Sequence, residues 1–543
     1  MTAPRRRVLV LGLDGASFRL LEPFAASGDM PELARLMAAG CHGELRSTFP
    51  PLTPPAWSSF MTGKNPGKHG VVSFRRAPAG YRTGDFINSR TLRARTLWDI
   101  VGGQGYTVGA INVVPSYPVQ PINGFMVSCM LSPPGAKDII HPPEYRRLLG
   151  DDYVISLEPP QQLVPSDPRY GEKAMDYLQR LRRLGLRRRE VALRLMRERP
   201  CDLLAAILYE PDRVQHFFWR HLTGGATPGE DAATTAELAA AARTIYRDVD
   251  ATIGELVQAA GPDATVFIIS DHGFGPAPDR FVYVNRWLAD QGWLYVHPTW
   301  RLRRRLVKQL PAKLRARYDT VENIFVNWNR SYAWCDAMET RSAAVWLNVK
   351  GRQPQGRVTP GVEYERLRDQ IRDGLAGLRD GDRPVFSLVA RREDVYHGPM
   401  TDTAPDLLLY TNPSHGLRFN GLRPELRAHA PFAEFVDYGF TGAHEPAGIY
   451  IVAGPDIAPL GRHERKPIEA IAPTILCLMG LAIPDGMDAK PLLDLLTPEA
   501  RAALPVRYVP DADPIHGGDD DPYASEEDRA QVEARLRALG YVE

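Results

Sequence analysis

Three aspartates and three histidines are notable because each lies beside a short apolar run that is typical of a buried β-strand. They are Asp14, after Val8–Leu13; Asp212 and His216, after Leu203–Tyr209; Asp271 and His272, after Thr265–Ser270; and His444, before Ile449–Ala453. The carboxyl ends of the strands in a doubly wound sheet form one ligand-binding edge. We therefore expect these six side chains to converge, although they are spread along the whole chain.

Six nitrogen and oxygen ligands are what two divalent metal ions need when open positions are kept for a substrate. Mixed imidazole and carboxylate ligation suits Zn²⁺ and tolerates Mn²⁺. Taken singly, Asp14 could be a helix cap, and Asp212 with His216 could be a surface pair. The polar pair Asp271-His272 follows an apolar run directly and needs partners if it is buried. The six residues together predict two divalent metal ions, with Zn²⁺ favoured over Mn²⁺.

A threonine in a proline-rich segment is the candidate nucleophile. Pro54 and Pro55 suit the first turn of a helix, where a missing N–H costs nothing. Thr53 would then be the N-cap, with its hydroxyl at a positive helix end that favours phosphate. A hydroxyl that binds a divalent cation loses its proton more easily and becomes a nucleophile. A plain N-cap threonine is the alternative interpretation.

Apolar runs that alternate with helix-period segments predict the elements that position these residues. A further strand is expected at 107–113, and helices at 30–39, 177–197, 235–259 and 472–479. This alternation indicates an α/β fold, a doubly wound and mostly parallel sheet flanked by helices. Residues 285–437 interrupt the alternation and predict an inserted cap subdomain. The expected organisation is a core at 1–284 and 438–505, the cap at 285–437, and a linker with a C-terminal helix at 506–543.

The composition excludes several classes of protein. The 543 residues include 66 Lys and Arg against 65 Asp and Glu, and a net charge of +1 gives no reason to expect a nucleic-acid polymer as partner. Five cysteines without a CxxC motif make a disulfide framework unlikely and favour a reducing compartment. No apolar run approaches the roughly 18–20 residues of a membrane span. The apolar run after Arg5-Arg6-Arg7 is too short for a signal peptide, so a cytoplasmic location is expected.

The order of the motifs resembles the alkaline phosphatase superfamily, and within it the type I phosphodiesterase/nucleotide pyrophosphatase branch. The bacterial group of predicted phosphohydrolases and phosphomutases is similar over most of the chain. The motifs are Val8–Gly15, Thr53 to Thr62-Gly63, Lys68-His69-Gly70, Asp212 with His216, Asp271-His272-Gly273, and Gly442 with His444. The resemblance implies an alkaline phosphatase-like fold and a metal-dependent phosphohydrolase.

Position by position, the resemblance also implies roles for single residues. Thr53 becomes the metal-bound nucleophile. One metal, next to Thr53, is held by Asp14, Asp271 and His272, and the other by Asp212, His216 and His444. Thr48 is a rival nucleophile because a Thr-Phe-Pro string also occurs in nucleotide pyrophosphatases. Thr53 is preferred because its nine-residue spacing to Thr62-Gly63 fits the nucleophile helix of the family.

One departure concerns the residue that binds a phosphoryl oxygen. Nucleotide pyrophosphatases have an Asn where this chain has Phe74, so another donor is expected there, either Arg75 or a residue of the insertion. Within the insertion, Lys350 and Arg352 are the predicted substrate contacts. The chain lacks the Cys/Ser-x-Pro-x-Arg pattern that sulfatases need, which disfavours a sulfatase.

The sequence therefore predicts a phosphodiesterase or nucleotide pyrophosphatase that acts on a small phosphorylated substrate through a phospho-threonine intermediate. A phosphomutase or phosphomonoesterase on the same two metals is the alternative, and a binding pseudoenzyme is a third hypothesis. The basic amphipathic stretch 301–317 could contact an anionic membrane surface weakly or attract the substrate, and a solvated helix face is the plainer interpretation. The sequence gives no indication of an oligomeric state.

Overall fold

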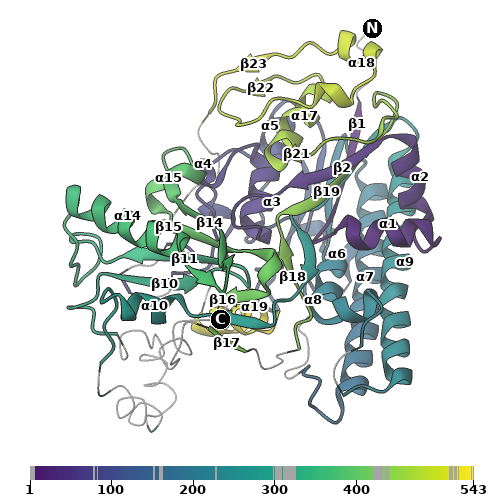
Figure 1. The fold of residues 1–543 in the computed structure, drawn as a ribbon. Helices are drawn as coiled ribbons and strands as arrows, with labels where there is room; N and C mark the ends of the chain where they lie inside the picture. The colour runs from purple at the N-terminus through teal and green to yellow at the C-terminus, as the bar shows by residue number, and fades with distance from the viewer. Residues whose placement is uncertain are drawn as a thin grey trace. The chain divides into compact units, whose positions relative to one another are not determined.

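Two compact units make up the protein in the computed structural model (Figure 1). The structure describes residues 6–77, 80–81, 84–150, 153–157, 163–226, 229–297, 299, 309, 326–419, 432–434, 439–512, 518, 523, 525–539 and 541. The first unit comprises 1–71, 87–276 and 437–540, and the second comprises 72–86, 277–436 and 541–543. The expected division into a core, a cap and a C-terminal segment stays a prediction. The longest segment of the second unit, 277–436, overlaps the expected cap at 285–437, and the unit also contains 72–86.

A large, mostly parallel sheet forms the centre of the first unit. Among the described residues its strands are β1 (Arg7–Leu13), β2 (Cys41–Arg46), β3 (Val108–Ile111), β4 (Gly124–Val127), β5 (Ile140–His141), β6 (Leu203–Leu208), β7 (Ala264–Ile269), β19 (Ala447–Ala453), β20 (Gly461–Arg462) and β21 (Lys466–Pro467). Their order is β20-β2-β19-β7-β1-β6-β3-β4-β5, and β21 also pairs with β2. The first strand of the chain therefore lies in the middle of the sheet, parallel to both β6 and β7.

Strand β19 runs antiparallel to its two neighbours, β2 and β7. Its amino-terminal end therefore lies at the edge where the parallel strands have their carboxyl ends. The short strand β18 (Gly442–Glu445) leads into β19 and pairs with β8 (Gly273–Pro276), which follows β7. This pairing brings His444 to the same edge of the sheet as Asp271 and His272.

Among the described residues the first unit has the following helices, several of which pack on the two faces of its sheet. They are α1 (Phe18–Ala26), α2 (Pro31–Ala39), α3 (Thr53–Thr62), α4 (Pro66–His69), α5 (Leu97–Gly103), α6 (Arg146–Leu149), α7 (Tyr170–Glu198), α8 (Glu210–Leu222), α9 (Ala232–Ala260), α17 (Ile471–Leu478), α18 (Pro498–Ala503) and α19 (Glu526–Ala538). Figure 1 shows the long helices α7 and α9 side by side. Leu9, Leu11 and Leu13 of β1 share a buried apolar cluster with them. On the other face, a Cβ at Gly12 would lie 2.4 Å from Trp57 of α3. Alternate residues of a strand point to opposite faces, so both sides of β1 are covered.

The C-terminal helix α19 packs in the first unit against the loop that follows β4. Arg535 Nη1 donates hydrogen bonds to the carbonyls of Met130 (2.9 Å) and Ser132 (2.8 Å), and Tyr523 Oη donates to the carbonyl of Leu131 (3.1 Å). Arg535 is 4% exposed, and Val532 and Leu536 are buried beside it. Three successive loop carbonyls therefore receive their hydrogen bonds from the C-terminal segment.

A smaller antiparallel sheet organises the second unit. Its strand order is β10 (Ala333–Ala337), β11 (Ser342–Leu347), β15 (Leu407–Thr411) and β14 (Phe386–Arg391). Other elements of the unit are α10 (Val284–Asp290), α14 (Val362–Ala376), α15 (Arg392–Val395), β9 (Arg280–Val282), β12 (Arg379–Asp380), β13 (Arg383–Pro384), β16 (Leu417–Phe419) and β17 (Phe432–Glu434). Two further strands among the described residues, β22 (Ile483–Pro484) and β23 (Tyr508–Val509), pair with each other in the first unit.

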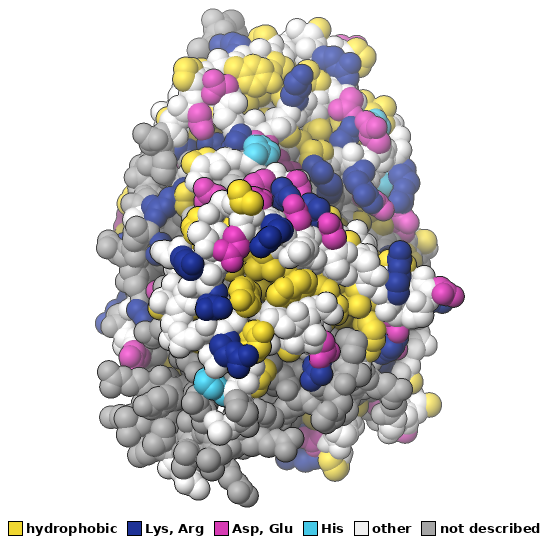
Figure 2. Space-filling view, turned by 60° about the vertical axis from the view of Figure 1, so that its left-hand side comes forward, with side chains coloured by type: hydrophobic (Ala, Val, Ile, Leu, Met, Phe, Trp, Pro, Cys, Tyr) yellow, Lys and Arg dark blue, Asp and Glu magenta, His cyan; other side chains and the backbone are white. Residues whose placement is uncertain are grey.

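Charges of both signs are interspersed over the described part of the face in Figure 2. This mixture agrees with the near-zero net charge of the chain. Of the basic stretch 301–317, only Gln309 lies within the described residues, so its contact with a membrane surface stays a prediction. Among the helices that the structure describes, we find none that is both long enough and apolar enough to cross a membrane.

Candidate functional site

Asp14, Asp271 and His272 form a group that we call the carboxylate-rich cluster. One ligand atom from each lies within 4.8 Å of the others, and all three side chains are fully buried. His272 Nε2 is 3.2 Å from Asp271 Oδ2 and 3.7 Å from Asp14 Oδ1. Asp14 directly follows β1, and the other two residues lie in the short link between β7 and β8. The pairing of β1 with β7 therefore places the three side chains at one edge of the sheet.

Asp212, His216 and His444 form a second group, the imidazole-rich cluster. Asp212 Oδ1 lies 3.3 Å from the Nε2 atoms of both histidines, and these two Nε2 atoms are 3.1 Å apart. Asp212 and His216 are four residues apart on α8 and therefore share one face of the helix. His444 reaches them from β18. The structure thus brings together all six predicted residues, in two groups of three.

The two clusters adjoin each other. The rings of His272 and His444 stack with their centroids 3.8 Å apart. Gly15 lies between the clusters, because its N–H donates to Asp271 Oδ1 (3.0 Å) and its carbonyl accepts from Gln215 Nε2 (2.9 Å). Its φ is +67°, and a Cβ there would lie 2.9 Å from the Phe274 ring and 3.4 Å from Asp212 Cα. Only glycine fits this backbone position without strain.

Two of the histidines turn Nε2 toward the clusters. His272 Nδ1 lies 3.1 Å from the carbonyl of Gly273, and His444 Nδ1 lies 3.2 Å from the carbonyl of Pro51. A carbonyl can only accept, so each Nδ1 carries a proton and each Nε2 faces its cluster. Metal-binding histidines usually donate their other ring N–H in this way.

The carboxylates of the first cluster are poorly accommodated as anions. Burial raises the pKa of Asp14 well above its ordinary value, and the nearby charges of Asp271 and Asp212 raise it further. Burial likewise raises the pKa of Asp271 to about 7. Both oxygens of Asp14 and Oδ2 of Asp271 are buried without a hydrogen-bond donor. Buried acceptors without a donor are costly, and a divalent cation would satisfy them.

The electrostatics of the imidazole-rich cluster are opposite. Burial alone would raise the pKa of Asp212, but His216, His444 and the adjacent Arg213 hold it well below its ordinary value. Burial lowers the pKa of His216, and burial lowers that of His272 in the other cluster well below its ordinary value. Neutral histidines and ionised carboxylates are the protonation states that bind divalent metals. The donor set and its geometry therefore fit two such ions.

Thr53 lies beside the carboxylate-rich cluster, with Oγ1 3.5 Å from His272 Nε2 and the side chain fully buried. The expectation that Thr53 is the N-cap of its helix is wrong, because Leu52 is the N-cap and Thr53 is the first residue of α3. Leu52 is extended (φ −134°, ψ 142°), so the helix begins one residue earlier than the two prolines indicated. The hydroxyl of the rival, Thr48, donates to the carbonyl of Pro50 (3.0 Å).

The comparison with known families matches residues 8–420 to a model described as "Type I phosphodiesterase / nucleotide pyrophosphatase". The chain belongs to this family. Membership confirms the predicted resemblance and makes the protein a phosphoester hydrolase of a metal-dependent family. The two clusters account for where metal ions could bind in such a hydrolase.

Solved structures confirm the α/β fold of this phosphodiesterase-family protein. Murine ectonucleotide pyrophosphatase/phosphodiesterase 5 (ENPP5) is similar with a TM-score of 0.51 at 13% identity, over 91% of this chain and 100% of that one. Phosphonoacetate hydrolase from Sinorhizobium meliloti 1021, in complex with phosphonoacetate, is similar with a TM-score of 0.51 at 17% identity, over 83% and 90% of the two chains. A search of curated proteins found no match. Such distant similarity shows the mostly parallel, helix-flanked fold alone.

Three residues expected to bind substrate make contacts inside the second unit of the hydrolase. Arg75 Nη1 donates to the carbonyl of Gly84 (3.1 Å), and its guanidinium carbon lies 4.0 Å from the Phe86 ring centroid. Arg352 Nη1 donates to Asp406 Oδ1 (2.8 Å), and Lys350 Nζ donates to Thr359 Oγ1 (3.0 Å). Phe74 is buried and stacks on Tyr541 at 4.8 Å. The substrate contacts of Arg75, Lys350 and Arg352 stay predictions.

Several residues that shape the site were not singled out from the sequence of this phosphodiesterase-family chain. Gln215 connects α8 to Gly15, and Glu210 and Arg213 flank Asp212 in the first turn of α8. A usable signal was present, since Glu210-Pro211 precedes Asp212 directly after an apolar strand. His69, of the Lys68-His69-Gly70 motif, accepts from the Val71 N–H at Nδ1 (3.2 Å) and donates from Nε2 to Ser59 Oγ of α3 (3.0 Å).

Proposed function

We propose that this protein is a two-metal phosphodiesterase of the nucleotide pyrophosphatase type, with Thr53 as its nucleophile. The observation that carries the proposal is the convergence of two adjoining three-ligand clusters with Thr53 Oγ1 beside His272. The nitrogen and oxygen donors favour Zn²⁺ and tolerate Mn²⁺.

Two divalent cations, when bound, would neutralise charge on the attacking and leaving oxygens of an in-line displacement. Asp14, Asp271 and His272 would hold the ion nearer Thr53, and Asp212, His216 and His444 the other. Thr53 loses its proton to water, and Oγ1 forms a bond to phosphorus while the bond to the leaving alkoxide breaks. The alkoxide takes a proton from solvent. Water then hydrolyses the phospho-threonine and restores Thr53, so that one diester and one water give a monoester and an alcohol.

A structural relative supports both the nucleophile and the substrate class. A second structure of murine ENPP5, with a TM-score of 0.50 at 13% identity, contains an inactive variant in which a threonine is replaced by alanine, in complex with AMP. It covers 91% of this chain and 100% of that one. An inactivating threonine-to-alanine change supports a threonine nucleophile here, and a bound nucleotide supports a small phosphorylated substrate.

The test is turnover of bis-p-nitrophenyl phosphate and p-nitrophenyl phosphate by Zn²⁺-loaded and Mn²⁺-loaded protein. We expect the diester to be preferred, and Thr53→Ala to lower kcat at least about 1,000-fold while both metals stay bound. Thr48→Ala is the matched control and keeps most of its activity. Loss of activity in Thr48→Ala with retention in Thr53→Ala would move the nucleophile to Thr48.

The same assay separates the alternatives. A preference for the monoester would favour a phosphomonoesterase or a phosphomutase, in which the phosphoryl group passes to an alcohol. A metal content near zero in the purified, metal-supplemented protein would favour a pseudoenzyme. We also propose a cytoplasmic location, because five cysteines without a CxxC motif favour a reducing compartment. Cell fractionation tests the location directly.

A further inference from the structure

A buried ion pair holds the first turn of α8, the helix that carries Asp212 and His216. Arg188 Nη1 on α7 donates to Glu210 Oε1 on α8 at 2.8 Å. Each of the two side chains is only 3% exposed. Glu210 is the first residue of α8 and precedes Asp212 by two residues. The pair therefore acts on the turn from which a predicted metal ligand projects.

Arg188 makes further contacts around the start of α8. Its Nη2 donates to the carbonyl of Ile155, and its guanidinium carbon lies 5.1 Å from the ring centroid of Tyr209. Tyr209 is the residue that joins β6 to α8, and its hydroxyl donates to the carbonyl of Asn112 after β3. One arginine thus contacts both the connecting residue and the first residue of the helix.

The helix α7 is shaped to accept Glu210. Gly185 lies one turn before Arg188, and a Cβ there would be 3.1 Å from Glu210 Cγ. A larger residue at 185 would press directly on the glutamate. The glycine costs helix stability, about 1 kcal/mol relative to alanine, yet it lies in the interior of a 29-residue helix. The close packing of Glu210 against this position explains why a glycine is found inside the helix.

Stability alone does not explain a buried ion pair at this place. Removing two charges from water costs about as much as their attraction returns, and apolar residues of similar volume would stabilise the fold equally well. A paired guanidinium and carboxylate do impose a defined geometry on the elements that carry them. Outer partners that orient metal ligands typically change metal affinity about 10–100-fold when they are removed.

We propose that Glu210, held by Arg188, is a positioning residue that sets Asp212 and His216 for metal binding in the imidazole-rich cluster. The proposal rests on the two-metal function proposed above. It assigns a role to α7, which supplies no ligand. The carboxylate-rich cluster, built on β1 and β7, does not depend on this pair.

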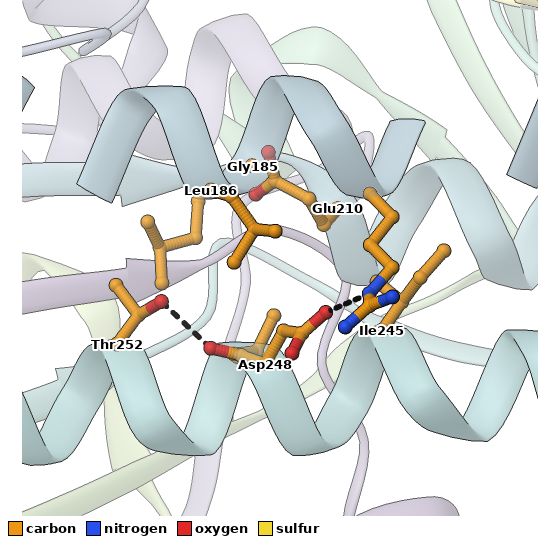
Figure 3. A pocket seen from close by; sticks show the side chains of 9 residues that line it. Gly185, Leu186, Glu210, Ile245, Asp248 and Thr252 are labelled. Carbon is orange, nitrogen blue, oxygen red and sulfur yellow. Dashed lines mark hydrogen bonds and ion pairs between the residues drawn. The ribbon is translucent and has the colours of Figure 1, made fainter. Parts of the chain in front are cut away.

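A second ion pair that also starts from α7 provides a control. Arg182 Nε of α7 pairs with Asp248 Oδ2 of α9 at 2.5 Å. Figure 3 shows Glu210 and Asp248 on the wall of the same small pocket, with the ion pair of Asp248 as a dashed line. Arg182 and Asp248 join α7 to α9. Loss of this pair, which is more exposed (Arg182 48%, Asp248 24%), removes an arginine–carboxylate contact of α7 without acting on α8.

The experiment is a Zn²⁺ titration of the metal-stripped full-length protein, which counts the sites and measures the affinity of each. Asp212→Ala identifies which of the two affinities belongs to the imidazole-rich cluster. We expect Glu210→Gln to weaken that affinity at least tenfold and to leave the other unchanged, and Asp248→Asn to change neither. Turnover of bis-p-nitrophenyl phosphate at limiting Zn²⁺ should fall in Glu210→Gln and recover as Zn²⁺ is raised.

A double variant separates positioning from folding. Arg188→Met with Glu210→Leu replaces the ion pair by apolar side chains, so the fold should survive even where Glu210→Gln unfolds. We expect the same weakening of one Zn²⁺ site in this variant. Unchanged Zn²⁺ affinities in the folded double variant, or equal weakening by Asp248→Asn, would overturn the proposal. An unsubstituted protein that binds no Zn²⁺ would instead contradict the proposed two-metal function itself.

Discussion

The two clusters contain the same kinds of side chain in opposite proportions. The carboxylate-rich cluster has two aspartates and one histidine, and the imidazole-rich cluster has one aspartate and two histidines. In the first, burial raises the pKa of both carboxyl groups. In the second, two histidines and an arginine hold the pKa of Asp212 well below its ordinary value. The difference shows that the groups around Asp212 stabilise the charge of the imidazole-rich cluster. The carboxylate-rich cluster instead depends on an added cation or on protons.

The largest expected effect comes from removing one carboxylate from each cluster in the metal-free protein at pH 7. We expect Asp212→Asn to lower the unfolding free energy by about 3–5 kcal/mol, because the buried guanidinium of Arg213 beside it loses its counter-charge. Asp271→Asn should leave it unchanged or raise it, because it removes a buried carboxylate with a raised pKa and keeps an acceptor for the Gly15 N–H. Urea denaturation measures both. Equal destabilisation by the two changes would contradict the contrast between the clusters.

The same contrast fixes a pH dependence. Asp271 holds a proton in the folded metal-free protein up to about pH 7, whereas in the unfolded chain it ionises near pH 3.8. Between these values the folded form binds more protons, so its stability falls as pH rises, by about 1.4 kcal/mol per pH unit from this group. Asp271→Asn should remove this slope. Metal binding requires the ionised carboxylate, so the affinity for Zn²⁺ should rise with pH up to about 7.

Gly15 offers a way to disturb both clusters together. Gly15→Ala should destabilise the protein by about 3 kcal/mol, because alanine is strained at φ +67° and its Cβ meets the Phe274 ring at 2.9 Å. Gly28→Ala is the control, since Gly28 also has a positive φ (+79°) but has open space around its Cβ position. Thermal unfolding of the two variants separates backbone strain from contact. Equal losses would show that Gly15 does not connect the clusters through its close packing.

The smallest expected effect comes from His69, a buried histidine outside both clusters. It gives the pH dependence of stability with which the clusters can be compared. Burial lowers the pKa of His69 to about 3, whereas the unfolded chain takes up a proton near pH 6.5. Stability is therefore complete above pH 6.5 and falls as pH decreases, by about 2 kcal/mol from pH 6.5 to pH 5. His69→Gln should remove this part of the acid sensitivity, as urea denaturation at several pH values would measure. If the unfolding free energies of His69→Gln and the unsubstituted protein fell equally with decreasing pH, the lowered pKa of His69 would be contradicted.

Buried parallel strands leave continuous apolar runs, and this is why the sequence predicted much of the fold. The expected strand 203–209 is observed at Leu203–Leu208, and the expected strand 265–270 at Ala264–Ile269. The helix expected at 177–197 is observed from Tyr170. The prediction missed its first turns because they carry few apolar residues. The convergence of the six candidate ligands followed from one rule about strand ends.

Features that depend on pairing between distant segments could not be predicted. The antiparallel direction of β19 cannot be predicted from local periodicity. It explains why His444 precedes its strand whereas Asp14 follows one. The contacts of Arg188 with Glu210 join different helices and have no local signal. The starting residue of α3 was missed by one position, since two adjacent prolines permit more than one register.

The antiparallel return of β19 has a consequence for the protein during its synthesis. After Asp14 has emerged from the ribosome, the imidazole-rich cluster still lacks one of its three members until His444 has emerged, 430 residues later. Arg535 of α19, which holds the loop after β4, follows later still. A nascent chain therefore carries no complete pair of clusters before His444 has been synthesised. The arrangement of the site withholds the complete pair from every copy that has not reached this residue.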